Sequence, residues 1–383
     1  MKKLLIVTTV PDTLDIILRK QPNYLNNYFE VFLATSKGER TFSIENQESI
    51  KVNIVPMIRG INPFYDLYSI YKMVKLLRII KPDIVHSYTP KAGLITMLSA
   101  WICRIPVRIH SFTGLIFPTS IGFKKKLLIS IDRLICRCAT EIVPEGNGVK
   151  NDLVNYEITH KELNVIGYGN IAGVDTTYFK RNLVADDHAV ISLRERLGLE
   201  DGAFLFCFVG RLTNEKGLNE LIDAFNLLSS NAHLLVVGEI DKSAKLDKRV
   251  RGQLDQHARI HLLGFQNDIR PALFISKVLV LPSYREGFPN VLLQAGAMSL
   301  PVIASDINGC NEIVTPGVNG WLVEAKEYQP LYAAMNKAMV SDSLESMSIE
   351  ARVNITTKFE RHVHWQRMVA FYNERVVSNE KNF

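Results

Sequence analysis

Short, unbroken apolar runs alternate with amphipathic segments along the whole chain. In the first half, runs rich in β-branched residues cover 4–9, 31–35, 52–57, 83–87, 107–113, 141–146 and 164–169. Helical patterns such as 63–80 lie between several of them. Continuous apolar strands separated by amphipathic helices are typical of a parallel sheet covered on both faces. The first half therefore predicts a doubly wound α/β domain.

The second half repeats this pattern after a stretch of weak periodicity at 173–187. Its apolar runs cover 204–210, 234–238, 260–264, 278–282 and 301–305. A clean helical face, with Leu218, Leu221, Ile222, Phe225 and Leu228 on one side, follows the first of these runs. We expect two doubly wound, Rossmann-like domains that face each other across a cleft. Ligands in such sheets bind beyond the carboxyl ends of the strands.

The expected boundaries follow from this alternation. An N-terminal domain covers 1–172, a connection covers 173–187, and a C-terminal domain covers 188–383. The last helix is an element that can pack back onto the N-terminal domain. A chain of 383 residues is long enough for two cores.

Composition narrows the function classes only modestly. A net charge of +6 is too small to indicate a nucleic-acid partner. The five cysteines form no Cys-x-x-Cys pair, which argues against a zinc site or a disulfide scaffold. No apolar run is long enough to span a bilayer. The N-terminal run stops at Pro11-Asp12 without a cleavage site and is interpreted as a strand. We expect a cytoplasmic protein with reduced thiols.

The loop after 204–210 has the features of an anion site. Arg211 and Lys216 precede a helix that begins near Leu218. A helix start offers unpaired N–H groups and the positive end of a dipole, and two flexible cations beside it favour a phosphate. A solvated polar loop is the alternative interpretation.

The stretch "REGFPNVLLQ" leaves the strand 278–282 in an unusual way. Glu286 is delivered to the ligand side, and Gly287 lets the backbone approach a ligand closely. Pro289 suits the first turn of the following helix. Asn290 and Gln294, four residues apart, share one face of that helix. A carboxylate in this place can accept hydrogen bonds from hydroxyl groups.

The paired signatures "GRLTNEKGLNELIDAF" and "PSYREGFPNVLLQAGAMSLPVIASD" resemble those of the family 4 retaining glycosyltransferases with the GT-B fold. The resemblance covers the C-terminal domain, and more loosely the N-terminal domain through "PDIVHSYTPKAGL". Within the family, the chain is similar to bacterial enzymes that build capsule, O-antigen or other lipid-linked surface glycans.

The resemblance implies roles for several residues of the two signatures and for two residues of the stretch "HLLGF". Arg211 and Lys216 would hold the donor diphosphate, and Glu286 would bind hydroxyls of the donor sugar as a positioning group. The implied donor-binding residues are Gly287, Phe288, Asn290 and Val291 through their backbone, Gln294 at the ribose, and Leu262 and Gly264 near the nucleobase.

Two residues depart from the family pattern. Gln294 stands where relatives carry a second Glu, so the ribose would meet an uncharged acceptor. Tyr88 replaces the second residue of a His-x-His pair whose first member, His86, is present. His110, at another strand end, is a candidate catalytic replacement. A core histidine is the open alternative for His110.

The N-terminal domain is expected to hold the acceptor. Helix 122–139 carries an apolar stripe, namely Phe123, Leu127, Ile131, Leu134 and Cys138, and a second stripe of Lys126, Ser130, Arg133 and Arg137. This second stripe is either a solvated basic face or a contact with anionic phospholipid or with the diphosphate of a polyprenyl-linked acceptor. The acceptor-side or sugar-proximal candidates are His86, Tyr88, Thr89, Lys91, Thr113 and Gly114.

The predicted activity is retaining transfer of a hexose or N-acetylhexosamine from a nucleotide-sugar, with UDP favoured by analogy, to a hydroxyl of a lipid-linked or growing surface glycan. No Asp-x-Asp occurs, so we expect neither a metal nor another cofactor. The protein would be cytoplasmic and peripheral on the inner face of the membrane. A nucleotide-sugar-binding protein without catalysis is the alternative. An NAD-linked oxidoreductase is less favoured, because "GYGNIAG" lacks the dinucleotide spacing.

Overall fold

The computed structural model describes residues 1–58, 60, 62–185, 187–200, 202–240 and 246–380. The chain divides into two compact units, each described here by itself. The first consists of Met1–Gly173 and Arg361–Phe383, and the second of Val174–Glu360. The C-terminal helix α15 (Arg361–Glu380) therefore belongs to the first unit. The segment expected as a connection, 173–187, counts with the second unit from Val174 onward.

Among the described residues, the first unit contains a parallel sheet of six strands in the order β3-β2-β1-β4-β5-β6. The strands are β1 (Lys3–Thr8), β2 (Glu30–Thr35), β3 (Val52–Ile54), β4 (Ile84–Tyr88), β5 (Val107–Phe112) and β6 (Glu141–Pro144). In this order the chain runs to one side of β1 for β2 and β3, and to the other side for β4, β5 and β6. The first switch in strand order therefore lies between β1 and β4.

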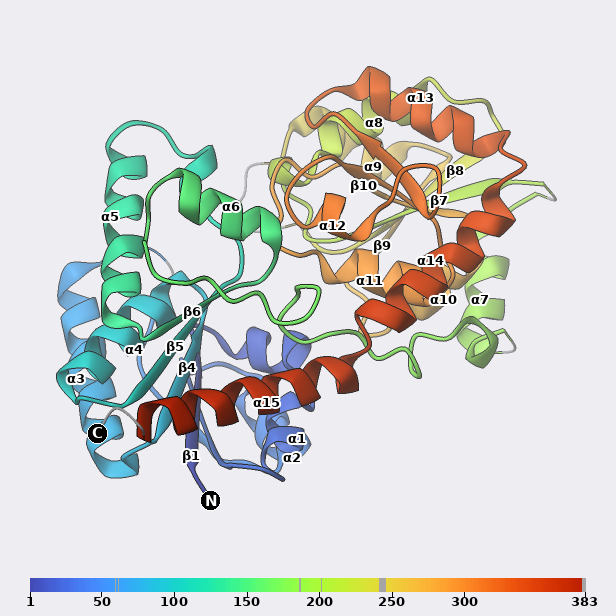
Figure 1. Cartoon of the computed structure of the whole chain (residues 1–383). Coiled ribbons are helices and arrows are strands. Elements are labelled where there is room, and N and C mark those ends of the chain that lie inside the picture. The colour runs from blue at the N-terminus through green and yellow to red at the C-terminus, as the bar shows by residue number, and fades with distance from the viewer. Residues whose placement is uncertain (59, 61, 186, 201, 241–245, 381–383) are drawn as a thin grey trace. The chain divides into compact units, whose positions relative to one another are not determined.

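Helices cover both faces of this sheet (Figure 1). On β1, Leu5 and Val7 pack into the cluster that contains α3 (Pro63–Ile80), α4 (Pro90–Ile102) and α5 (Gly122–Cys138). Leu4 and Ile6 point the other way, into the cluster with α1 (Gln21–Leu25), α2 (Thr41–Glu48) and α15. This alternation is the period of two that a strand buried on both faces requires. The remaining helical segments are η1 (Thr13–Ile17), η2 (Phe117–Thr119) and α6 (Asn147–Asn155).

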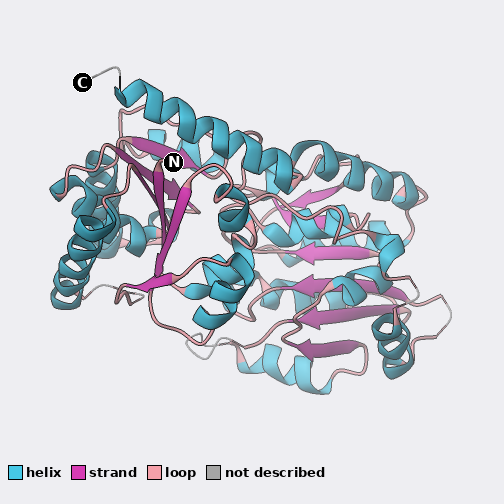
Figure 2. Cartoon of the chain, turned by 90° about the horizontal axis from the view of Figure 1, so that it is seen from below, coloured by secondary structure: helices cyan, strands magenta, loops and turns pink. Residues whose placement is uncertain are grey.

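The second unit repeats the architecture with the order β12-β11-β10-β7-β8-β9 (Figure 2). Its strands are β7 (Phe204–Val209), β8 (Ala232–Val237), β9 (Ile260–Gly264), β10 (Val278–Leu281), β11 (Val302–Ser305) and β12 (Gly320–Val323). Its helical segments are η3 (Arg181–Leu183), α7 (His188–Leu197), η4 (Asn214–Lys216), α8 (Leu218–Asn226), α9 (Lys248–Gln256), α10 (Arg270–Ile275), α11 (Asn290–Ala297), α12 (Cys310–Ile313), α13 (Tyr328–Met339) and α14 (Leu344–Lys358). Here the order switches between β7 and β10, so the loops that leave these two strands are neighbours.

The pattern of apolar runs predicted most strands, and the structure confirms them, with two differences. The run 164–169 is not a strand. Gly167 and Gly169 have positive φ angles of 64° and 98°, and the Gly169 N–H donates to the Ile166 carbonyl, so the backbone turns. Conversely, β12 was not expected. It is a short edge strand that pairs in parallel with β11.

The expected apolar stripe of the helix at 122–138 is only partly correct. Phe123 is 80% exposed and Leu134 is 38% exposed, although both belong to that stripe. The buried residues of α5 are Asp132, Ile135, Cys136 and Cys138, so burial begins only in the second half of the helix. The basic residues of the second stripe are exposed, as expected.

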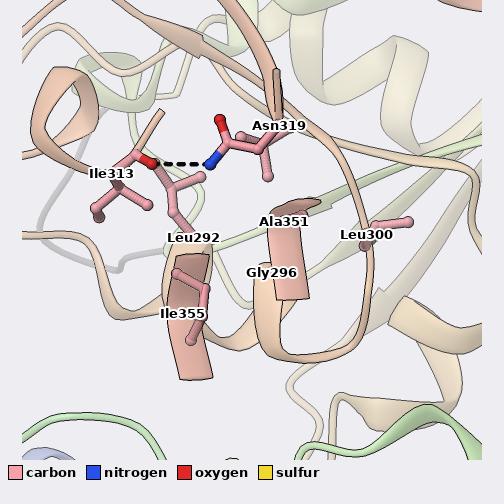
Figure 3. A pocket seen from close by; sticks show the side chains of 8 residues that line it. Leu292, Gly296, Leu300, Ile313, Asn319, Ala351 and Ile355 are labelled. Carbon is pink, nitrogen blue, oxygen red and sulfur yellow. Dashed lines mark hydrogen bonds between the residues drawn. The ribbon is translucent and has the colours of Figure 1, made fainter. Parts of the chain in front are cut away.

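A small apolar pocket lies inside the second unit, between α11, α14 and the starts of β11 and β12 (Figure 3). The Asn319 side-chain amide borders it and donates to the Ile313 carbonyl at 3.0 Å. Leu300 and Val302 line it where the chain enters β11. Because ligands of such sheets bind at the other, carboxyl edge, we interpret this pocket as a packing gap in the core.

Candidate functional site

Lys216 and Glu286 meet at the switch point of the second unit. Lys216 ends η4 behind β7, and Glu286 lies in the loop behind β10. The Lys216 Nζ is 2.5 Å from Glu286 Oε1, and the two side chains are 20% and 12% exposed. Strands β7 and β10 are neighbours in the sheet, which brings together two loops 70 residues apart. The sequence predicts both residues at one ligand, and the structure adds that their side chains are in contact.

Glycines allow these loops to pack closely. Gly217 has φ 71°, and a Cβ there would lie 1.9 Å from the Pro282 carbonyl oxygen. Gly238, behind β8, is equally close to the carbonyl oxygen of Gly210. Any larger residue at either position would force neighbouring backbones apart. The exits of β10, β7 and β8 are thus held side by side at one edge of the sheet.

A third loop, behind β11, reaches the same place. Gly309 has φ 76°, and a Cβ there would lie 2.0 Å from the carbonyl oxygen of Gly287. Cys310 follows it and is fully buried. Burial raises the pKa of the Cys310 thiol, and the neighbouring Glu286 carboxylate raises it further. Gly309 and Cys310 are additional residues of this edge that lie outside the two sequence signatures, although "INGCNE" also follows a strand end.

The chain behind Glu286 enters α11 as expected. Phe288 is buried and its ring packs 5.5 Å from that of Phe359. Pro289 is the residue before the first helical position, one place earlier than expected. Asn290, Val291 and Gln294 are half-buried on the first turns of α11. This arrangement directs the first N–H groups of an eight-residue helix toward the loop that carries Glu286.

The remaining donor candidates lie on either side of the Lys216–Glu286 pair. Arg211 is exposed two residues behind the end of β7. Leu262 and Gly264 belong to β9, the edge strand, and both are half-buried. The Gly264 carbonyl accepts from the Gly238 N–H at 2.9 Å, which ties the end of β9 to the loop behind β8. The candidates therefore share one edge of one sheet.

Tyr284, which is not among the predicted site residues, is a further anchor of the Glu286 loop. Its backbone N–H donates to the Glu215 carbonyl at 2.9 Å. Its hydroxyl donates to the Glu220 carboxylate at 2.7 Å, and Lys326 lies over its ring. Burial and the Glu220 carboxylate raise the pKa of the Tyr284 phenol. Tyr284 thus fastens the Glu286 loop to α8.

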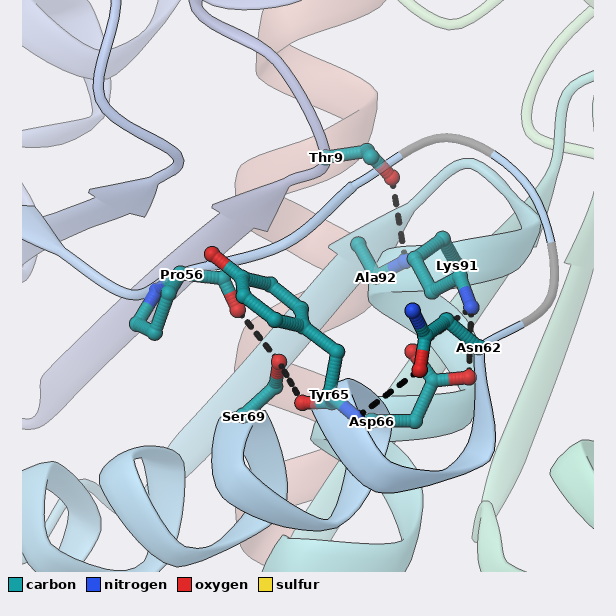
Figure 4. A network of polar contacts seen from close by, with 8 residues as sticks. All are labelled: Thr9, Pro56, Asn62, Tyr65, Asp66, Ser69, Lys91 and Ala92. Atoms are coloured by element: carbon teal, nitrogen blue, oxygen red, sulfur yellow. Dashed lines mark hydrogen bonds and ion pairs between the residues drawn. The ribbon is translucent and has the colours of Figure 1, made fainter.

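In the first unit, polar side chains gather at the switch between β1 and β4 (Figure 4). The hydroxyl oxygens of Thr9 and Thr89 are 2.6 Å apart, and Thr9 Oγ1 accepts from the Ala92 N–H at 3.1 Å. Thr89 has φ 75°, a strained conformation for a β-branched residue. Lys91 Nζ contacts both carboxylate oxygens of Asp66 at 2.7 Å. Thr89 and Lys91, both candidates, are therefore brought together, with Thr9, Ala92 and Asp66 as additional members.

His86 and Tyr88 lie in the core of the first unit, beneath α15. His86 is fully buried, and its two ring nitrogens lie 2.7 Å from the Tyr372 hydroxyl and the Ser111 hydroxyl. Burial lowers the pKa of His86 well below its usual value. The Tyr88 ring stacks on His86 at 4.2 Å and is 1% exposed. The structure does not bring these side chains to the edge where Thr89 and Lys91 lie.

His110 is buried on the opposite face of the same sheet. Its Nδ1 lies 2.9 Å from the Ser87 hydroxyl, and a Cβ added to Gly93 of α4 would overlap its ring. Burial lowers the pKa of His110 to about 3. These contacts match the core alternative left open by the sequence. Thr113 and Gly114 follow β5 and are half-buried.

The site in the second unit offers charged side chains and hydrogen-bonding groups. Among the described residues, no group of three or more His, Cys, Asp or Glu side chains is arranged to hold a metal ion. What this edge provides is a pair of cations, one carboxylate and the start of α11. Such a set suits a ligand that carries both phosphate and hydroxyl groups.

Comparison with known proteins shows the family of the chain. The family described as "Glycosyl transferases group 1" matches residues 191–354, and "Glycosyltransferase Family 4" matches residues 23–169. A capsular polysaccharide biosynthesis glycosyltransferase, CapM of Staphylococcus aureus, is 30% identical over 372 residues, which cover 95% of each chain. An Escherichia coli UDP-Gal:alpha-D-GlcNAc-diphosphoundecaprenol alpha-1,3-galactosyltransferase is 27% identical over 86% of each chain.

Solved structures show the same fold. Anabaena HepE, crystallised with UDP and glucose, superimposes with a TM-score of 0.82 at 19% identity, over 98% of this chain and all of that one. The lipopolysaccharide glycosyltransferase WaaG superimposes with a TM-score of 0.69 at 14% identity. Two parallel-sheet units of this kind constitute the GT-B fold. The chain belongs to glycosyltransferase family 4 and is a retaining glycosyltransferase.

Proposed function

We propose that this protein transfers a hexose or N-acetylhexosamine from a UDP-sugar to a hydroxyl of a lipid-linked surface glycan. The observation that carries the proposal is the contact of Lys216 with Glu286 at the switch point of the second unit. This contact brings a cation and a carboxylate side by side. A nucleotide-sugar carries its diphosphate next to its sugar hydroxyls, so a cation beside a carboxylate suits these two parts of the ligand. The names of two relatives support the class of acceptor, since both act on sugars linked to diphosphoundecaprenol.

Each residue has a defined role under this proposal. Lys216 and Arg211 bind the diphosphate and stabilise the negative charge that develops as it leaves the anomeric carbon. Glu286 accepts hydrogen bonds from hydroxyls of the donor sugar and fixes its orientation. Asn290 and Val291 offer backbone N–H groups at the start of α11. Gln294, one turn further along, accepts from the ribose through its amide oxygen.

The proposed reaction needs no metal. The leaving diphosphate carries negative charge, which the two cations and the start of α11 neutralise in place of a divalent ion. Retention of the anomeric configuration follows from attack on the face from which the diphosphate departs, with a phosphate oxygen receiving the acceptor proton. Glu286 then positions the sugar and forms no covalent bond to it.

We assign the acceptor to the carboxyl edge of the first sheet, where Thr89 and Lys91 lie. Among the described residues, no helix is long and apolar enough to cross a bilayer. A lipid-linked acceptor stays in the membrane, so the enzyme would work as a peripheral protein on its inner face. The exposed cations at the start of α5, Lys124 and Lys126, are suited to anionic phospholipid.

The proposal is tested by incubating the protein with a panel of UDP-sugars and a polyprenyl-diphosphate-linked sugar, without added metal. Release of UDP that depends on the acceptor, and a product heavier by one sugar in mass spectrometry, are expected. Tight binding of UDP without turnover would instead identify a nucleotide-sugar-binding protein. Activity only with divalent metal would contradict the assignment of Arg211 and Lys216.

A further inference from the structure

The helices α3, α4 and α5 form one layer over one face of the first unit's sheet, and α4 packs against both of its neighbours. We call them the α3–α5 layer. It contains only two carboxylates, Asp66 and Asp132, and both are buried. Its nine cations give it a surplus of seven positive charges, against +6 for the whole chain. These cations are Lys72, Lys75, Arg78, Lys91, Lys124, Lys125, Lys126, Arg133 and Arg137.

The outer surface of α3 is apolar and aromatic where an ordinary surface helix is polar. Phe64, Leu67 and Tyr71 are 86%, 65% and 62% exposed, and Tyr68 is 48% exposed. Their spacing of three and four residues aligns them in one stripe along α3, which we call the α3 ridge. Because the inner face of α3 is buried in the core as well, the ridge is not needed to fold the helix.

A second exposed apolar group lies at the start of α5. Ile121 and Phe123 are 86% and 80% exposed, directly ahead of Lys124, Lys125 and Lys126. Helices that follow parallel strands begin at the carboxyl edge of the sheet, so the starts of α3 and α5 lie at the same edge, and α4 packs against both helices. The two apolar groups and their cations therefore border one end of the layer.

We propose that the α3–α5 layer seats the enzyme on an anionic phospholipid bilayer, with the α3 ridge inserted at the level of the headgroups. Tyrosine and phenylalanine rings beside lysine are typical of helices that lie in this interface. Lys72, which lies 5.3 Å over the Tyr68 ring, supplies such a pair. Exposed cations attract anionic lipid, and the layer exposes no carboxylate to oppose them.

The charge of the layer disfavours a second copy of the chain as the occupant. A two-fold interface would place the same surface on both sides, and hence cation against cation. A bilayer of anionic lipid complements both the cations and the rings. The anionic membrane, and not a second copy of the chain, is therefore the partner of the α3–α5 layer under this proposal.

The membrane surface would lie next to the proposed acceptor residues. Asp66 precedes Leu67 of the ridge and points inward, where its carboxylate holds Lys91. The loop that contains Thr89 and Lys91 is thus fastened to the inner side of the helix whose outer side carries the ridge. This inference rests on the proposed lipid-linked acceptor and deepens it, because it names the surface that delivers the enzyme to that lipid.

The test is cosedimentation of the full chain with vesicles. One set contains phosphatidylcholine and phosphatidylglycerol in equal parts, and the other contains phosphatidylcholine alone. The variant Phe64→Ser/Leu67→Ser/Tyr71→Ser, called the ridge variant, removes the three most exposed residues of the α3 ridge and leaves Tyr68 in place. Phe42→Ser is the matched control, because Phe42 is 73% exposed on α2, whose cluster lies on the other face of the same sheet. Lys72→Glu/Lys75→Glu tests the charge without touching the ridge.

We expect wild type and Phe42→Ser to bind the anionic vesicles, and the ridge variant to bind at least about tenfold more weakly. The Lys72→Glu/Lys75→Glu variant should lose binding to anionic vesicles most strongly at low salt. Unchanged binding of the ridge variant would overturn the proposal, as would a wild-type dimer that the ridge variant dissolves.

Binding of UDP to each variant, measured by calorimetry, separates this inference from the proposed function. The ridge and the donor candidates lie in different units, so UDP affinity should be equal in all variants. Failure of every variant, wild type included, to bind UDP would count against the donor site and leave the vesicle result to stand by itself.

Discussion

Lys216 and Glu286 form an ion pair in which the two charged atoms are 2.5 Å apart, at the point where the strand order of the second sheet switches. Each side chain limits the positions that the other can occupy. A half-buried pair of this kind is weak evidence for stability, because the cost of desolvation offsets much of the attraction. Its location at the ligand edge of the sheet is the stronger argument for a functional role.

Lys216→Ala and Glu286→Ala should each reduce turnover by about 10²- to 10³-fold, since each removes a group proposed to act on the donor during transfer. Circular dichroism should show an intact fold in both. The control is Arg251→Ala, which removes a pair on the exposed side of α9, to Asp255 at 3.9 Å. Normal turnover in either site variant would contradict the assignment of the donor site.

Gln294→Glu should bind UDP more tightly than the wild type, because a carboxylate accepts more strongly from the two ribose hydroxyls than an amide oxygen does. Gln294→Ala should bind more weakly. Calorimetric titration with UDP measures both. Equal affinities in all three proteins would show that residue 294 does not contact the ribose.

Gly309→Ala should impair donor binding more than an ordinary glycine substitution. The added methyl group would meet the Gly287 carbonyl oxygen and displace the loop that carries Glu286. Gly317→Ala is the matched control. Gly317 has the same φ of 76° but open space around it, so only the strain of a positive φ remains, about 1 kcal/mol. If both variants bind UDP equally well, the close approach of the two loops has no role in the site.

Asp66→Asn should raise the KM for the acceptor and leave the affinity for UDP unchanged. The substitution removes the charge that holds Lys91 in place, while the donor candidates lie in the other unit. Steady-state kinetics with varied acceptor and fixed donor separates the two effects. A change confined to the donor KM would place Lys91 outside the acceptor site.

Burial raises the pKa of Asp132 to about 7, which makes the stability of the first unit depend on pH. The unfolded carboxyl group titrates near pH 4, so between about pH 4 and 7 the folded state retains a proton that the unfolded state has lost. Its contribution to stability is full below about pH 4 and declines up to about pH 7. Asp132→Asn should therefore stabilise the protein above pH 7, by about 4 kcal/mol at most, and have little effect at pH 4.

Denaturant unfolding of the wild type and of Asp132→Asn, at pH 4 and above pH 7, measures this difference in the free energy of unfolding. An equal effect at pH 4 and above pH 7 would contradict the raised pKa of Asp132 in the folded protein.

The sequence alone predicts most of the donor candidates, because Arg211, Lys216 and Glu286 lie in two short signatures at strand ends. Parallel strands deliver such residues to one edge by topology alone. The contact between Lys216 and Glu286 was not accessible in the same way. It depends on β7 lying next to β10 in the sheet, and local sequence patterns do not predict the order of strands in a sheet.

The acceptor candidates of the first unit show that the periodicity of apolar residues does not predict which distant elements cover a side chain. His86 and Tyr88 stand near a strand end in the sequence, yet α15, nearly 300 residues later, covers them through Tyr372. The expected stripe on α5 failed for a related reason. Spacing identifies an apolar face, but the neighbouring elements decide how much of it is buried, and Phe123 stays 80% exposed.

A crystal structure of the protein with UDP bound tests the central claim most directly. We expect the diphosphate oxygens to lie within hydrogen-bonding distance of the Lys216 Nζ and the Arg211 guanidinium, with the uracil near Leu262 and the ribose near Gln294. UDP bound elsewhere, with the Lys216–Glu286 pair untouched, would contradict the donor site as described.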